Sequence, residues 1–268
     1  METLTLLTGG FLLKIEFTHS EVPQISNSFK RQVKNHFRSF KVDSSQHRKI
    51  DFIIHVHDAS HTVYSQRKNL EEGREFISLF LERKKGRIIT NYHLSLSQFI
   101  HLVSFVVIQL LQDHKGFMLH GSASNIFGKA HVYTGISGAG KSTAVLLLER
   151  KFPRLEDDRV IIKEEKDEYM FYHTPMVVKT GTLRRNYKGY PLAAVYFLSK
   201  TPYFKMNTLS KKDEILRLLL SQVVADADTY KKSIENLHRF VSKFNGFYSL
   251  SFRKDARGMV SLFSRVSS

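Results

Sequence analysis

The sequence predicts an α/β (α+β) protein, in which an α/β unit built around a glycine-rich loop follows a small α+β domain. From residue 117 onward, strand-like apolar stretches alternate with amphipathic helical stretches, an order typical of α/β proteins. Residues 135–142 place three glycines between an apolar strand and a helical run. The first hundred residues instead place a basic, helix-compatible stretch between two strand-like segments.

The N-terminal part, residues 1–93, contains no motif of a recognised family. Residues 11–17 and 50–56 alternate or cluster apolar side chains as strands do, and residues 26–40 between them favour a basic helix. We therefore expect a small α+β domain here.

A second domain, residues 94–268, is expected to begin with a helix. Residues 94–113 are densely apolar with a helical period, and Lys115-Gly116 follows as a stop signal. The longest apolar tract within it, residues 99–111, is interrupted by His101, Ser104 and Gln109 and is too short to cross a bilayer core of about 30 Å, so we expect a buried helix. Beyond it we predict strands at 118–123, 130–134, 160–163, 169–172, 193–198 and 248–252, a turn at 127–129, and helices at 142–151, 212–225 and 229–244.

Composition limits the class of protein. The chain has 268 residues and no cysteine, which excludes disulfides, thiolate metal sites and cysteine nucleophiles and favours a cytoplasmic location. Forty-one Lys and Arg against 25 Asp and Glu give a net charge of +16, which favours anionic partners.

The loop at residues 135–142 reads Gly-Ile-Ser-Gly-Ala-Gly-Lys-Ser, the P-loop pattern. Glycines let its backbone N–H groups wrap a phosphate closely, Lys141 brings a positive charge to the β and γ phosphates, and the Ser142 hydroxyl can bind magnesium. The alternative is a glycine-rich turn, which we disfavour because an apolar strand precedes the loop and a helical run follows it. The sequence therefore predicts ATP and Mg²⁺, bound by Gly135, Ile136, Ser137, Gly138, Ala139, Gly140, Lys141, Ser142 and Thr143.

Two further groups are candidates for chemistry. Asp157 and Asp158 follow about one helix after the loop, where carboxylates can bind magnesium and accept a proton from a hydroxyl. The alternative is a solvated turn before the next strand. His120 is expected at the end of a strand beside the P-loop strand, where an imidazole can steady a phosphate or a carboxylate; a purely structural histidine is the alternative.

Three blocks together, residues 119–123, 135–143 and 155–158, resemble the catalytic domain of HPr kinase/phosphorylase and its HPr kinase-like relatives. The resemblance extends over about residues 117–198. It implies a P-loop fold related to phosphoenolpyruvate carboxykinase, homo-oligomers, and phosphorylation of seryl hydroxyls on proteins, peptides or free serine. It also implies that His120 is the active-site histidine, Lys141 the phosphate-binding lysine, Ser142 and Asp157 magnesium ligands, and Asp158 the proton acceptor.

The resemblance departs at one point. HPr kinases proper carry a second magnesium-binding glutamate downstream of the paired aspartates, whereas no Asp or Glu occurs between Glu168 and Asp213 here. We therefore do not extend it to phosphorylase activity. The same stretch is basic, and Arg184 and Arg185 are candidates for contacts with an anionic substrate; a solvated basic surface is the alternative.

The sequence thus favours an ATP-dependent serine kinase whose acceptor is an anionic protein, peptide or small molecule. The rival is a nucleotide-gated binding module without phosphotransfer, and a third interpretation is a plain ATP hydrolase. Nucleic acid is a weaker candidate partner: residues 29–49 interleave basic and aromatic side chains, but at helical spacing those aromatics favour a core.

Overall fold

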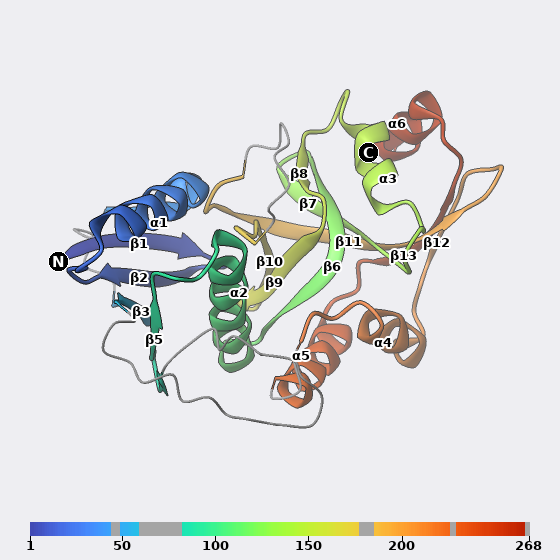
Figure 1. Ribbon diagram of the computed structural model, residues 1–268. Coiled ribbons are helices and arrows are strands. Elements are labelled where there is room, and N and C mark those ends of the chain that lie inside the picture. The colour runs from blue at the N-terminus through green and yellow to red at the C-terminus, as the bar shows by residue number, and fades with distance from the viewer. Residues whose placement is uncertain (44–48, 59–81, 177–184, 226–228, 266–268) are drawn as a thin grey trace, which may run out of the picture.

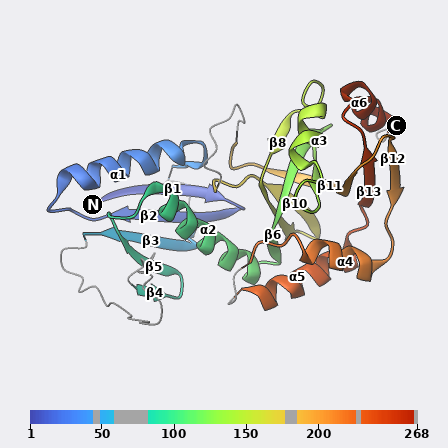
Figure 2. The same cartoon turned by 45° about the vertical axis from the view of Figure 1, so that its right-hand side comes forward.

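Two β-sheets lie side by side in the computed structural model, which describes residues 1–43, 49–58, 82–176, 185–225 and 229–265 (Figure 1). The first sheet is built from residues 2–91 and the second from residues 116–252. Figure 2 shows the helices α1 and α2 beside the first sheet. The mixed α/β class predicted from the sequence is confirmed.

The first sheet has the strand order β1-β2-β3-β5-β4. Its opening hairpin turns through Gly9-Gly10, both at positive φ, a conformation that glycine adopts without a Cβ penalty. The helix predicted at 26–40 begins earlier and ends at His36, and a short 3-10 turn, η1 (Arg38–Phe40), follows it. The bounds are β1 Glu2–Thr8, β2 Phe11–Phe17, α1 Pro23–His36, β3 Phe52–His57, β4 Glu82–Lys84 and β5 Arg87–Asn91.

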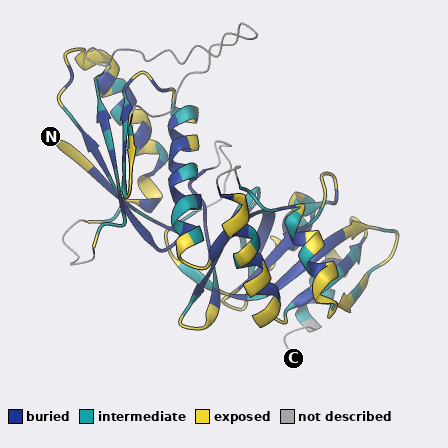
Figure 3. Cartoon of the chain, turned by 90° about the horizontal axis from the view of Figure 1, so that it is seen from below, coloured by how far each residue is buried: buried dark blue, intermediate teal, exposed yellow. Residues whose placement is uncertain are grey.

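Helix α2 (Leu96–Asp113) is the predicted buried helix. Ser95 caps its first turn by a capping box with Gln98. By length and composition α2 could cross a membrane, but half of that window is buried inside the protein. Its apolar side chains share one core cluster with the first sheet and with Met118 and Ile161 of the second, so α2 joins the two sheets (Figure 3).

The second sheet has the order β10-β9-β6-β7-β11-β13-β12, with β8 paired to β6. β10 also pairs with β11, so five of these strands form a closed ring. Strands β7, β11 and β13 are parallel, and their carboxyl ends therefore meet at one edge. The strand bounds are β6 Gly116–Ile126, β7 Lys129–Thr134, β8 Arg154–Glu156, β9 Arg159–Glu165, β10 Glu168–Tyr172, β11 Gly189–Lys200, β12 Lys205–Thr208 and β13 Phe247–Phe252.

Helices cover both faces of this sheet (Figure 1). Val132 on one face of β7 belongs to the cluster that contains the apolar sides of α4 (Lys212–Leu220) and α5 (Tyr230–Lys243). The next residue, Tyr133, belongs to the cluster with α3 (Lys141–Leu148) and α6 (Ala256–Arg265). This two-residue alternation is expected of a strand buried on both sides.

Two sequence-based expectations were wrong in detail. The helix predicted at 212–225 ends at Leu220, because the backbone around Val223 pairs with β6 instead: Val224 N–H donates to the Met118 carbonyl at 2.8 Å. His120 does not lie at the end of a strand but in the middle of β6, which continues to Ile126.

Candidate active site

The glycine-rich loop joins β7 to α3, as the P-loop pattern predicts. Gly135, Gly138 and Gly140 adopt φ values of 145°, 80° and 101°. A Cβ at position 140 would lie 2.9 Å from Phe252 Cζ, and one at position 135 would lie 3.1 Å from Ala139 Cβ. Glycine is therefore required at 140 by both backbone conformation and space.

Lys141 lies over this loop. Its Nζ donates to the Gly135 carbonyl at 2.7 Å and to the Ile136 carbonyl at 3.2 Å. Partial burial lowers the pKa of Lys141, and the nearby Asp158 carboxylate opposes this shift. Ser142 is exposed in the first turn of α3, where the positive end of the helix dipole favours an anion.

Strand β6 changes partner at its midpoint, and this change creates the site. His120 is the last residue of β6 in register with β9, and Gly121 is the first in register with β7, opposite Thr134. The Thr134 hydroxyl donates to the His120 carbonyl at 2.9 Å, directly before the P-loop begins. His120 is thereby held beside the loop although it lies 21 residues before Lys141.

The two aspartates occupy the bend between β8 and β9. The Asp158 Oδ1 lies 3.3 Å from His120 Nδ1, and the Gly121 N–H donates to the Asp158 carbonyl at 3.0 Å. Burial and the Lys141 charge lower the pKa of His120, while Asp158 raises it. Ser122 Oγ donates to Asp157 Oδ1 at 3.3 Å. The structure therefore brings His120, Lys141 and Asp158 into electrostatic contact, with Asp157 beside Asp158 on the same bend.

The donor set fits magnesium held jointly with a nucleotide. Within the described ranges, no group of three or more His, Asp and Glu side chains could hold a metal by itself. Mg²⁺ is usually bound through one or two carboxylates together with substrate phosphates. Asp157 and the exposed Ser142 hydroxyl supply protein oxygens of this kind.

Arg185 is engaged in a buried ion pair. Its Nε lies 3.0 Å from both carboxylate oxygens of Glu156, and its Nη2 lies 2.8 Å from Oε1. Arg184 lies outside the described residues. Sequence reasoning missed the role of Glu156, and its only signal was its place in the acidic run beside Asp157 and Asp158.

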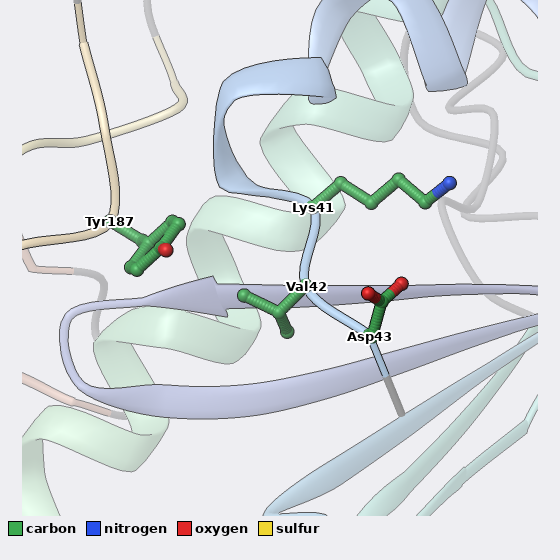
Figure 4. Close-up of a pocket in the computed structure, with 4 residues that line it drawn as sticks. All are labelled: Lys41, Val42, Asp43 and Tyr187. Carbon is green, nitrogen blue, oxygen red and sulfur yellow. The ribbon is translucent and has the colours of Figure 1, made fainter. Parts of the chain in front are cut away.

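A shallow depression elsewhere is lined by Lys41, Val42, Asp43 and Tyr187 (Figure 4). None of these residues belongs to the P-loop or to the bend at 157–158. The depression lies where the chain after η1 approaches the segment that follows Arg185, so it is separate from the candidate nucleotide site.

Comparison with curated proteins finds HPr kinase/phosphorylase from Peptoclostridium acidaminophilum, 31% identical over 113 residues. That match covers 41% of this chain and 36% of the relative, so it spans about a third of the relative's length. This sequence match supports an HPr kinase-like relationship. Among solved structures, the HPr(Ser) kinase/phosphatase from Coxiella burnetii matches with a TM-score of 0.29 and 10% identity, covering 56% of this chain and 93% of that one. No family model matches the chain.

Proposed function

We propose that this protein is an ATP-dependent kinase that transfers the γ-phosphoryl group to a seryl hydroxyl of an anionic protein, peptide or small molecule. The observation that carries the proposal is the convergence of His120, Lys141 and Asp158 at the end of the P-loop strand.

The chain's own groups divide the work. The loop from Gly135 to Ser142 cradles the ATP phosphates through backbone N–H groups, and Lys141 exchanges its loop carbonyls for phosphate oxygens. Ser142 and Asp157 would hold Mg²⁺, which when bound neutralises phosphate charge. Asp158 accepts the proton of the acceptor hydroxyl, and His120 keeps that carboxylate oriented.

The transfer is a single displacement at the γ-phosphorus. The acceptor oxygen forms a bond to the γ-phosphorus while the bond from that phosphorus to the β-γ bridging oxygen breaks, and ADP leaves. The hydroxyl proton passes to the Asp158 carboxylate, which stands in contact with His120 at 3.3 Å. Positioning and electrostatics supply most of the rate in such a reaction.

The lowered pKa of His120 supports its assignment. Because burial and Lys141 favour the neutral imidazole, His120 Nδ1–H can donate a hydrogen bond to the Asp158 carboxylate without adding a full positive charge to the site.

The domain organisation belongs to this proposal. β5 ends at Asn91 and α2 begins at Leu96, so we keep the boundary between residues 93 and 94, with the first sheet as the part that selects the acceptor. The net charge of +16 supports an anionic acceptor. We include a cytoplasmic location and a homo-oligomer in this proposal because of the HPr kinase-like relationship.

The test is transfer of labelled γ-phosphate from ATP with Mg²⁺ to peptides and small proteins encoded beside the gene and to free serine. The wild type is compared with Lys141→Ala and with Lys129→Ala, an exposed lysine at the start of the P-loop strand, as a matched control. Label on a seryl hydroxyl that depends on Lys141 but not on Lys129 supports the proposal. Tight ATP binding with no labelled acceptor favours the nucleotide-gated module, and steady phosphate release to water favours a hydrolase.

A further inference from the structure

The side chain of Glu156 is fully buried, at 0% exposure, directly before the two aspartates of the candidate site. Arg185 meets its carboxylate with Nε and Nη2, in the forked arrangement that gives a guanidinium pair its directionality. The arginine itself is 15% exposed. This pair therefore lies in the interior, where taking two charges out of water is costly.

The Glu156 carboxylate also holds backbone. Its Oε1 accepts the N–H of Asp157 at 3.1 Å, and its Oε2 accepts the N–H of Thr174 at 3.3 Å. The side chain thus fixes the first peptide of the bend that carries both aspartates. Through Thr174 it also ties that bend to the segment after β10, where the Pro175 carbonyl contacts the His36 ring of α1 at 2.6 Å.

Strand pairing alone does not fix this bend. β8 is three residues long, and its ladder with β6 is irregular between Ala123 and Ser124. The Glu156 carboxylate supplies an acceptor for the Asp157 N–H at this irregular strand end. A side chain that orients a metal-ligating or proton-accepting carboxylate has this kind of second contact.

We propose that the buried Glu156–Arg185 pair is a positioning device that holds the Asp157-Asp158 bend so that its carboxylates face the P-loop. The inference rests on the proposed function. It assigns Arg185 as a positioning residue that acts through Glu156, in place of the substrate contact that its basic neighbourhood suggested.

The experiment measures the affinity of the full chain for a fluorescent ATP analogue with and without Mg²⁺. The ratio of the affinity with Mg²⁺ to the affinity without it reports whether a carboxylate is in place to bind the metal. Four variants are compared with the wild type: Arg185→Met, Arg185→Lys, the double variant Glu156→Met/Arg185→Met, and Glu164→Gln. The last is the matched control. Glu164 is also a buried carboxylate and forms ion pairs with Arg239 and Lys243, but it lies at the end of β9 that is far from the Asp157-Asp158 bend.

The double variant separates positioning from stability. Replacing both members of a buried ion pair with apolar side chains of similar volume often preserves or improves folding, whereas removing one member leaves a buried charge unpaired. We therefore expect the double variant to fold without the carboxylate that accepts the Asp157 N–H. Its thermal unfolding temperature, measured alongside binding, verifies the fold.

In the double variant and in Arg185→Met, we expect the gain from Mg²⁺, the ratio of the affinity with Mg²⁺ to the affinity without Mg²⁺, to fall by about 10- to 100-fold. The affinity measured without Mg²⁺ should not change. Arg185→Lys restores part of the gain, and Glu164→Gln keeps all of it. A folded double variant with a wild-type gain overturns the inference, as does a wild type whose affinity does not respond to Mg²⁺. An intact Mg²⁺ response in the absence of any phosphoryl transfer overturns only the proposed function.

Discussion

Acid sensitivity at His131 is a prediction that the structure makes quantitative. His131 lies on β7, 6% exposed, with Nδ1 3.0 Å from the Tyr196 hydroxyl and its ring stacked on that of Tyr196 at a centroid distance of 5.8 Å. Burial lowers the pKa of His131 to about 4, from a usual value near 6.5. The unfolded chain therefore binds this proton more readily than the folded chain does.

The sign and size of the pH effect on the free energy of unfolding follow from this difference in pKa between the unfolded and folded states. Where the unfolded state binds more protons, the free energy of unfolding falls as pH falls. The loss begins near pH 6.5 and is complete near pH 4. Between pH 7.5 and 5.0 the His131 contribution amounts to about 2 kcal/mol. His173, whose pKa burial also lowers to about 4, adds a second contribution of the same sign and similar size.

The assay is chemical denaturation at pH 7.5 and at pH 5.0. Stopping at pH 5.0 limits the contribution of Glu164, which with a pKa of about 2 loses its stabilising charge only at lower pH. His131→Gln should reduce the difference between the two pH values by about 2 kcal/mol. His238→Gln, at an exposed position on α5, should leave it unchanged. A His131→Gln variant with the full wild-type difference would refute the reasoning.

Three further predictions concern the site and the core. Asp158→Asn should bind ATP normally but transfer phosphate about 10²- to 10⁴-fold more slowly, as judged from single-turnover labelling; near-normal transfer would remove Asp158 from the base role. Gly140→Ala should abolish ATP binding in titration calorimetry, because its Cβ meets Phe252 Cζ at 2.9 Å, whereas Gly128→Ala, with no atom within 4 Å of the added Cβ, should bind normally. Phe240→Ala, fully buried on α5, should lower the free energy of unfolding by about 3 to 5 kcal/mol in urea; a loss below 1 kcal/mol would contradict its place in the core.

Local sequence patterns were sufficient to predict some secondary-structure elements. The P-loop is encoded by contiguous residues, so its strand, positive-φ glycines and following helix could be read directly from 129–148. The apolar period of 96–113 likewise gave helix α2. β1 and α6 were missed although local signals existed: Gly9-Gly10 is a hairpin signal, and Met259 and Phe263 have the i, i+4 spacing of a helix that faces a core.

Other features depend on contacts between distant residues. Glu156 and Arg185 are 29 residues apart in the sequence. A run of basic side chains does not reveal that one of them forms an ion pair with a buried carboxylate. The end of α4 is similar, because helical periodicity continues past Leu220 while the backbone leaves the helix to pair with β6. In both cases tertiary pairing outweighs local preference.

The position of His120 shows how the two sheet partners of β6 build the site together. Up to His120 the strand pairs with β9, and beyond it with β7, so the β7 side of its first half is open to another partner. The segment around Val223 takes that place: the Gln222 carbonyl accepts the His120 N–H at 2.8 Å. The histidine backbone is thereby fixed on one side by the chain that follows α4 and on the other by the β9 ladder. Because Thr134 holds the His120 carbonyl just before the P-loop, a change at Gln222 that moved this backbone would also move the contact between His120 and Asp158.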